Sequence, residues 1–299
     1  MSNHNLCILG CGNLGTAILQ SLLTSASPLF TNYIACVQTS SSVERLTNQF
    51  PDQTSNNTLT ISSPTNNNQS IASASVVILA LDPSAIATNL SKPGLREALA
   101  AKLLISVAAG WTRQKLEETI YGDATTPENQ GERAFIIRTL PNIAALVSES
   151  LTAIEIDSER DIPSQHLDLT NAIFDTVGKT LQIPPSLIDA TTAVAGSTPA
   201  MFAVIVDAMV DAAVAVGVPR AMAQSMVFQA MRGTAGMLQS GVHPGLLKDQ
   251  GTSPEGCTIG GLMVMEERGV RGGVGRAVRE AVTLARRMDG VGHVNDTRE

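Results

Sequence analysis

Short apolar runs alternate with helix-like segments from the start of the chain to about residue 183. Six runs have the β-branched or leucine-rich composition of strands: residues 5–9, 33–38, 76–81, 102–108, 134–138 and 152–156. They are continuously apolar rather than alternating, as strands covered by helices on both faces are. The pattern predicts βαβ units and therefore an α/β domain built on a doubly wound parallel sheet.

Two polar segments interrupt this rhythm, residues 52–75, which are rich in Asn, Ser and Thr, and residues 121–132. Both have the composition of solvated loops. The strand pattern ends at residues 183–186, and beyond them Ala, Met, Val and Gly dominate long helical stretches. We expect two domains, an α/β domain over residues 1–183 and an all-α domain over residues 184–299.

A long apolar helix is predicted from residue 199 to about residue 218, with Ser197 and Pro199 suited to its first turn. Asp207 and Asp211 lie one helical turn apart within it and would be costly in a bilayer, so no membrane span is expected. The helix is apolar on nearly every face, and about 115 residues make a thin core around it. Burial against a second subunit is therefore expected.

The chain has 299 residues, 43% of them hydrophobic, and a formal net charge of −7. This acidic balance gives no general attraction to phosphate backbones or anionic lipid, so neither nucleic acid nor a membrane is expected as a partner. Residues 1–5 lack the basic region of a signal peptide and the Arg-rich pattern of a transit peptide, which favours a cytoplasmic protein.

The four cysteines form neither a CxxC pair nor a dense framework. Cys7, Cys11 and Cys36 fall in or next to predicted strands, and Cys257 stands far from them, so we interpret them as buried free thiols. The four histidines are too scattered for a metal site or a catalytic triad, and no metal is expected.

A GxGxxG motif follows the first predicted strand directly and opens a helix. Its residues are Gly10, Gly12 and Gly15, with Asn13 and Leu14 between the last two glycines. In a strand-to-helix context these glycines allow a tight turn, close approach of a pyrophosphate and packing of helix on strand. The motif predicts a dinucleotide site, and a glycine turn without chemical meaning is the alternative.

The end of the second predicted strand indicates which dinucleotide is bound. An NAD enzyme places a carboxylate there, whereas this chain has Gln38, Thr39 and Ser40, with Arg45 one turn into the next helix. These donors suit a 2′-phosphate, so NADP(H) is preferred and NAD(H) remains possible. The same residues would also make an ordinary helix N-cap, which is the alternative.

Four blocks of sequence resemble the Δ1-pyrroline-5-carboxylate reductases, which make proline by reducing a cyclic imine with NAD(P)H. They are residues 10–15, residues 138–142 (like R-x-M-P-N), residues 195–200 (like S-G-S-G-P-A) and residues 243–261 (like H-P-x-x-L-K-D…S-P-G-G-x-T). The last block is the most specific. The resemblance spans nearly the whole chain and implies a Rossmann-type domain followed by a helical dimerisation domain.

The resemblance also implies the positions that bind the cofactor and the substrate. On the nicotinamide side it implies Ala108, Ala109, Gly110, Pro141 and Asn142; near the phosphates and adenine it implies Ala80, Leu81, Pro83 and Asn66. Ser253, Gly256, Cys257 and Thr258 are implied to hold the substrate carboxylate, and Thr258 is implied to lie near the ring nitrogen as hydride reaches C5. Simple helix capping is the alternative for Ser253 and Thr258.

Three positions depart from the family pattern: Thr198 and Glu255 replace glycines, and Asp82 stands where the family usually has Lys. We hypothesise that Glu255 shapes substrate preference, and a specialised reductase for a substituted pyrroline carboxylate is the alternative function. A β-hydroxyacid dehydrogenase is disfavoured because its interdomain helix needs a Lys, and none lies between Lys179 and Lys248. A non-catalytic cofactor sensor is disfavoured because it needs no substrate loop.

Members of the resembled family are dimers with interlocked helical domains, and some form a pentamer of dimers. The substrate loop of one subunit meets the nicotinamide bound by the other. The resemblance therefore implies a homodimer, with a higher assembly of dimers left open.

Overall fold

The computed structural model describes residues 5–63, 66–123, 130–158, 162–290 and 292–298. The chain forms two compact units. The first unit runs to Gly196 and also includes Leu284–Val294, and the second comprises Ser197–Thr283 with the last residues of the chain. The division between the two units, at Gly196 and Ser197, lies about a dozen residues beyond the expected 183/184 boundary. The expected domain boundary therefore remains a prediction.

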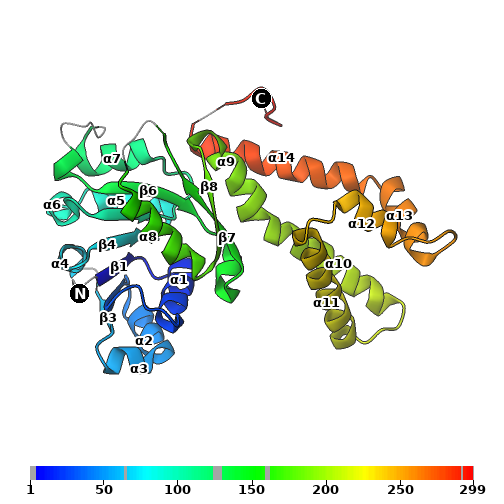
Figure 1. Cartoon of the computed structure of the whole chain (residues 1–299), viewed down its shortest axis with the longest axis horizontal. Helices are drawn as coiled ribbons and strands as arrows, with labels where there is room; N and C mark the ends of the chain where they lie inside the picture. Colours follow the sequence, from blue (N-terminus) through cyan, green and yellow to red (C-terminus); the bar gives the residue numbers. More distant parts are fainter. Residues whose placement is uncertain (1–4, 64–65, 124–129, 159–161, 291, 299) are drawn as a thin grey trace. The chain divides into compact units, whose positions relative to one another are not determined.

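The first unit is built on an eight-stranded sheet in the order β3-β2-β1-β4-β5-β6-β7-β8 (Figure 1). The strands are β1 (Asn5–Leu9), β2 (Asn32–Cys36), β3 (Leu59–Ser62), β4 (Val76–Leu79), β5 (Leu103–Ser106), β6 (Phe135–Leu140), β7 (Ser150–Glu155) and β8 (Gly178–Ile183). The first six strands are mutually parallel in the Rossmann order 3-2-1-4-5-6. This confirms the predicted α/β fold.

Helices cover both faces of this sheet. They are α1 (Asn13–Thr24), α2 (Ser40–Gln49), α3 (Pro51–Ser55), α4 (Asn67–Ser73), α5 (Pro83–Leu90), α6 (Leu95–Leu99), α7 (Arg113–Tyr121) and α8 (Ser164–Asp175). Shorter helical turns are η2 (Gln130–Glu132), η3 (Ile143–Val147), η4 (Pro185–Leu187), α9 (Ile188–Thr191) and the π-helical η5 (Thr192–Ser197).

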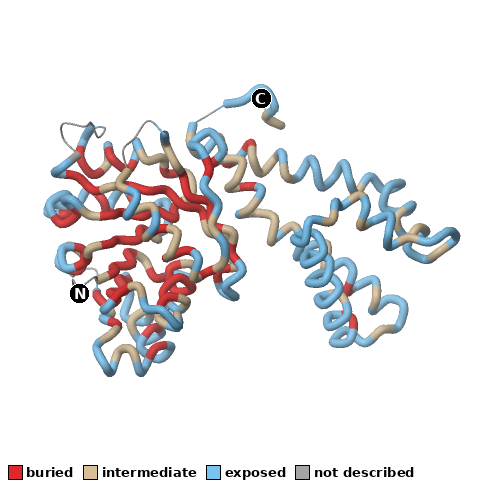
Figure 2. The backbone as a smooth tube through the Cα atoms, in the orientation of Figure 1, coloured by how far each residue is buried: buried red, intermediate tan, exposed pale blue. Residues whose placement is uncertain are grey.

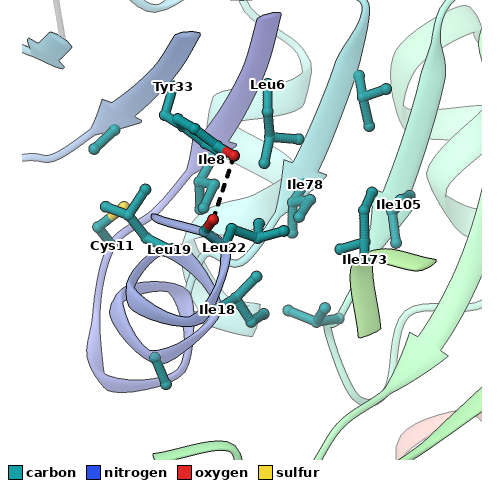
Figure 3. Packing of buried hydrophobic residues seen from close by; sticks show 14 of the residues in the cluster. Leu6, Ile8, Cys11, Ile18, Leu19, Leu22, Tyr33, Ile78, Ile105 and Ile173 are labelled. Carbon is teal, nitrogen blue, oxygen red and sulfur yellow. Dashed lines mark hydrogen bonds between the residues drawn. The ribbon is translucent and has the colours of Figure 1, made fainter. Parts of the chain in front are cut away.

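Two apolar cores, one on each face, hold the sheet between its helices. On one face, side chains of α1, α2 and α8 pack against alternate residues of the strands, such as Leu6 and Ile8 of β1 (Figure 3). On the other face, α4, α5, α6 and α7 pack against Cys7 and Leu9 of the same strand. Figure 2 shows the buried residues gathered in the sheet and the helix faces that cover it. The continuous apolar runs arise because both faces of each strand are buried.

The structure corrects three details of the predicted sheet. Strand β7 runs antiparallel to β6, so the sheet is parallel in its larger part only. Strand β3 lies inside the segment 52–75 that was predicted to be a solvated loop. Strand β8, which pairs with β7, was not predicted at all. In the other polar segment, residues 124–129 lie outside the described part of the chain.

The second unit is helical. It contains α10 (Thr198–Ala215), α11 (Arg220–Gln239), α12 (Pro244–Gln250), α13 (Cys257–Glu267) and the larger part of α14 (Val270–Met288). Within this chain α10 buries only Val210, and Figure 2 shows these helices largely exposed. Residues Pro185–Ala215 are, among those described, the one helical stretch long and apolar enough to cross a membrane by length and composition alone.

Candidate active site

The loop between β1 and α1 is shaped by contacts that exclude side chains at two of its three glycines. Gly10 has a φ of +103°, and a Cβ there would lie 2.6 Å from the carbonyl oxygen of Ala80. A Cβ at Gly15 would lie 2.2 Å from the carbonyl oxygen of Gly10. Gly12 is different, since a Cβ there would meet nothing within 4 Å. The fold itself therefore requires Gly10 and Gly15, while the space at Gly12 is open for a ligand.

A cavity of about 390 Å³ lies beside this loop. It is formed at the carboxyl ends of β1, β2 and β4, where the strand order reverses and open α/β sheets bind their ligands. The lining residues come from the loops that follow these three strands: Gly10, Cys11, Gly12, Asn13, Cys36, Val37, Gln38, Ser42, Arg45, Ala80, Leu81, Asp82 and Ala85. Seven of these were expected from the sequence, namely Gly10, Gly12, Asn13, Gln38, Arg45, Ala80 and Leu81.

Arg45 brings a positive charge to the cavity. Its Nη2 donates to the carbonyl oxygen of Cys11 at 2.6 Å, and its Nη1 donates to Oγ1 of Thr16 at 3.3 Å. The guanidinium has donors beyond those two bonds, and they can bind an anion in the cavity. Thr39 is the N-cap of α2 and accepts a bond from the Ser42 amide at 3.2 Å, as the capping alternative predicted.

Asp82 lies on the rim of the cavity and caps α5. Its Oδ1 accepts bonds from the amide and the hydroxyl of Ser84, at 2.9 and 2.5 Å. These hydrogen bonds hold the pKa of Asp82 below its ordinary value, so it is a carboxylate at neutral pH. The residue that replaces the family's lysine is therefore used to start a helix.

The other expected cofactor residues do not line this cavity: Leu14, Gly15, Thr39, Ser40, Asn66, Pro83, Ala108, Ala109, Gly110, Pro141 and Asn142. Leu14 and Gly15 lie in the first turn of α1, and Pro83 is the first residue of α5. Asn66 is exposed at the N-cap of α4, where its side chain makes no capping bond.

The residues expected at the nicotinamide end lie in turns that follow β5 and β6. The amide of Ala108 donates to Oγ of Ser106 at 3.3 Å, and Gly110 has a φ of +72°. Asn142 caps η3 by accepting from the amide of Ala144, and its Nδ2 donates to the carbonyl oxygen of Ala195 at 2.9 Å. Both turns are at the carboxyl ends of parallel strands, as a Rossmann site requires.

The buried thiols lie beside the same cavity. Cys7, Cys11 and Cys36 are free and buried, as predicted, whereas Cys257 is free but exposed in the single chain. Burial raises the pKa of the Cys11 thiol to about 12. Cys11 is therefore neutral at physiological pH and adds no charge to the cavity. Among the described residues, no group of three or more His, Cys, Asp or Glu could hold a metal ion.

The expected substrate loop lies in the second unit, before α13. The helix begins at Cys257 with Gly256 as its N-cap and no capping bond from a side chain. The hydroxyls of Ser253 and Thr258 are therefore not used to cap the helix, and both residues are exposed. A Cβ at Gly256 would lie 2.5 Å from Oγ of Ser253. The loop presents amides and hydroxyls that can bind a carboxylate at a helix N-terminus.

Glu255 has a φ of +58°, in the left-handed region that glycine adopts without cost. This explains physically why the family pattern has glycine at this position. Glu255 therefore adds a negative charge and an unfavourable backbone conformation to the loop itself.

Six residues that line the cavity were not among the expected site residues: Cys11, Cys36, Val37, Ser42, Asp82 and Ala85. Most stand within a few positions of an expected residue, in the loops after β1, β2 and β4. The rule that ligands bind at the carboxyl ends of these strands would have found them, because it selects whole loops instead of single motif positions.

Comparisons with known proteins agree with this architecture. A family model described as pyrroline-5-carboxylate reductase dimerisation matches residues 185–288, and one described as NADP oxidoreductase coenzyme F420-dependent matches residues 5–110. The solved structure of pyrroline carboxylate reductase from Plasmodium falciparum with NADP bound has a TM-score of 0.79 at 24% identity, covering 97% of this chain and all of that one. The corresponding structure from Coxiella burnetii has a TM-score of 0.78 at 23% identity, with the same coverage. These two likenesses concern the fold.

Closer sequence relatives show the family. A pyrroline-5-carboxylate reductase from Lophium arboricola is 39% identical over 317 residues, which cover 99% of this chain and 97% of the relative. The one from Neurospora crassa is 35% identical with the same coverage. Since these matches span both units, they confirm the family that the sequence motifs indicated. The chain belongs to the pyrroline-5-carboxylate reductase family.

Proposed function

We propose that this chain reduces Δ1-pyrroline-5-carboxylate to L-proline, with NADP(H) as the hydride carrier. The observation that carries this proposal is the 39% identity over 99% of the chain to a protein named pyrroline-5-carboxylate reductase. The cavity at the switch point of the sheet supports it, because its glycine loop and its arginine suit a phosphorylated dinucleotide.

The residues around the cavity fit NADP(H). The open space at Gly12 admits a pyrophosphate to the amides at the N-terminus of α1. Arg45, Gln38 and Ser42 line the same cavity and supply donors for a 2′-phosphate. When bound, the reduced nicotinamide supplies the hydride. The protein's task is then to position the two reactants and to exclude water.

In this proposal the loop before α13 holds the substrate carboxylate. The amides of Gly256, Cys257 and Thr258 and the hydroxyl of Ser253 are the donors, and the helix terminus favours a negative charge. With substrate bound, the Thr258 hydroxyl would lie beside the ring nitrogen and stabilise the proton there as hydride reaches C5. The turns of Ala108–Gly110 and Pro141–Asn142 would hold the nicotinamide.

The exposed apolar helices support a homodimer. The matched dimerisation model covers 185–288, which includes α10, α11 and α13 with their exposed Phe202, Val204, Met226 and Met263. These side chains leave water when two copies associate. Assembly beyond the dimer and a cytoplasmic location remain predictions.

A substituted pyrroline carboxylate is the second candidate substrate, and Glu255 is the observation that favours it. A carboxylate next to the substrate loop would repel the common carboxylate of every such substrate. It would attract a ring substituent that carries a positive charge or a hydrogen-bond donor. The choice between the two substrates therefore depends on what the side chain of Glu255 meets.

The test is steady-state oxidation of NADPH, and separately of NADH, with Δ1-pyrroline-5-carboxylate and with a methyl-substituted pyrroline carboxylate. The proposal predicts a kcat/KM of about 10⁴ M⁻¹s⁻¹ or higher on the unsubstituted imine, with NADPH preferred. Turnover of the substituted ring alone would assign the specialised function instead. Turnover of neither would overturn both.

A further inference from the structure

A buried cluster of charges lies where β6 ends, close to the expected nicotinamide turns. Arg138 of β6 donates to Oε2 of Glu155 at 3.0 Å and to Oδ2 of Asp289 at 3.2 Å. All three side chains are less than a tenth exposed. A buried ion pair of this kind is strongly disrupted when one partner is removed, since the other charge is left without compensation.

Asp189 joins this cluster through Asp289. The carboxyl group of Asp289 lies near that of Asp189, and a hydrogen bond between two carboxyl groups requires a proton on one of them. Burial and the nearby Asp289 raise the pKa of Asp189 to about 6. Oδ1 of Asp289 is buried and has no hydrogen-bond partner among the described residues. A proton on Asp189 therefore gives Asp289 a second donor besides Arg138.

The two aspartates come from the two places where the chain passes between its compact units. Asp189 is in α9, shortly before the first unit ends at Gly196. Asp289 follows α14, shortly after the chain re-enters that unit at Leu284. The carboxyl pair thus ties the leaving segment to the returning segment, and Arg138 ties both to the sheet.

Both segments contact the turns expected at the nicotinamide. A Cβ built on Gly110 would lie 3.2 Å from Cβ of Met288 and 4.0 Å from Oδ1 of Asp289. Asn142 donates to the carbonyl oxygen of Ala195, in the segment that follows Asp189. A movement of either segment would therefore move a turn that the proposed function places at the reacting ring.

We infer that Arg138 is a positioning residue for hydride transfer. By holding Asp289 it fixes the two connecting segments against Gly110 and Asn142, and the proton shared by Asp189 and Asp289 fastens the segments to each other. This inference rests on the proposed function. It gives Arg138, in the 138–142 motif, a task that requires no contact with either reactant.

The interaction between Asp189 and Asp289 depends on pH because the proton between them is lost as pH rises. The charged groups around the pair are Arg138 from β6, Glu155 and Asp157 at the end of β7, Arg113 from α7 and Arg286 from α14. Above about pH 6 both aspartates are ionised and repel each other, with Arg138 and Arg286 as the compensating charges. The segments are therefore held more tightly at pH 5.5 than at pH 7.5.

The first experiment compares Asp289→Asn with the wild type, using NADPH deuterated at both C4 positions of the nicotinamide. Asparagine at position 289 loses the ion pair with Arg138, which loosens the Gly110 turn, so kcat falls tenfold or more and the deuterium isotope effect on kcat rises. The KM for NADPH changes less than threefold, because the cavity at Gly12 and Arg45 is untouched. A wild-type kcat and isotope effect in this variant would overturn the inference.

Asp157→Asn is the matched control. Asp157 forms an ion pair with Arg113 at 2.8 Å near the same end of the sheet, whereas Arg138 forms its ion pairs with Glu155 and Asp289. The control variant should keep kcat and the isotope effect within twofold of the wild type. If Asp157→Asn has the same effects as Asp289→Asn, the loss of any carboxylate at this end of the sheet explains the result, and the inference fails.

Asp189→Asn is the second variant, and it covers the case in which Asp289→Asn does not fold. The asparagine amide donates to Asp289 at every pH, so the isotope effect should be equal at pH 5.5 and 7.5. In the wild type it should rise between these two values. The same rise in Asp189→Asn would contradict the shared proton.

Failure of the proposed function can be recognised separately. If the wild type oxidises no NADPH with any pyrroline carboxylate, the function is wrong, and thermal unfolding then tests the carboxyl pair. Because the pKa of Asp189 is raised in the folded state, its proton stabilises the fold at low pH and this stabilisation is lost as pH rises through about 6. The wild-type Tm should therefore fall relative to that of Asp189→Asn from pH 5 to pH 7.5, and parallel curves would overturn the pairing.

Discussion

Arg45 donates from Nη2 to the carbonyl oxygen of Cys11 at 2.6 Å, and so joins the first turns of α2 to the glycine loop before α1. The same guanidinium lines the cavity proposed for NADP(H). One side chain therefore links the two loops that meet the adenosine end of a dinucleotide. This relationship makes Arg45 the first residue to change in a test of cofactor preference.

Replacing Arg45 by Met should lower kcat/KM for NADPH about 10- to 100-fold, since charge-assisted hydrogen bonds contribute about 1.5–3 kcal/mol. The value for NADH should change much less, because NADH lacks the 2′-phosphate. The ratio of the two values is the measurement. Arg96→Met is the control, because Arg96 lies over the ring of Tyr121 and not in the cavity. Equal losses with both cofactors would show that Arg45 only shapes the loop.

Two glycines of the same loop have different expected roles, since Gly15 is required by the fold and Gly12 leaves space for the cofactor. Gly15→Ala places a Cβ 2.2 Å from a backbone oxygen, so it should cost about 1–3 kcal/mol of unfolding free energy or prevent folding. Gly12→Ala meets no protein atom within 4 Å and should leave the Tm within about 2 °C. It should nevertheless weaken NADPH binding tenfold or more, because the methyl group occupies the space for the pyrophosphate. Titration calorimetry and thermal unfolding of both variants check this contrast, and unchanged NADPH affinity in Gly12→Ala would contradict the placement.

Glu255→Gly should stabilise the protein by about 0.5–1 kcal/mol in denaturant unfolding. The φ of +58° costs a non-glycine residue about 1–2 kcal/mol, and the greater freedom of glycine in the unfolded chain offsets part of the gain. Glu255→Gln is the matched control, since it keeps the backbone cost and removes the charge. If charge sets the substrate preference, both variants change the relative kcat/KM of the two imines. If neither variant changes it, Glu255 has no part in specificity.

Thr258→Val should lower kcat on the imine tenfold or more without lowering the Tm. The hydroxyl of this exposed residue makes no hydrogen bond among the described contacts, so its loss leaves no buried partner unpaired. Thr119→Val on α7 is a control in which a hydroxyl that donates to a helix carbonyl is removed away from the site. A wild-type kcat in Thr258→Val would remove Thr258 from the proposed mechanism.

The central strands were predictable because both of their faces are buried, which leaves a continuous apolar run in the sequence. The strands that escaped prediction lie at the two edges of the sheet. Strand β3 has two buried residues in a stretch rich in Asn and Thr, and β8 buries only Ile183. The antiparallel direction of β7 could not be predicted either, because the composition of a strand does not depend on the direction of the neighbouring strand.

The candidate site was predictable where a backbone requirement fixes the residue. Gly10 and Gly15 are such cases, because no side chain fits there. Arg138 was noticed only as part of a motif, since its partners Glu155 and Asp289 are distant in sequence and are brought to it by the fold. Asp189 could not have been singled out, because its raised pKa depends on burial beside a carboxyl group a hundred residues away.

The most direct test of the proposed function is to follow the hydrogen that is transferred. The purified protein is incubated with NADPH dideuterated at C4 and Δ1-pyrroline-5-carboxylate, and the product is examined by mass spectrometry and NMR. We expect L-proline that carries a single deuterium at C5, formed in step with the oxidation of NADPH. Proline without deuterium at C5, or oxidation of NADPH without proline, would contradict it.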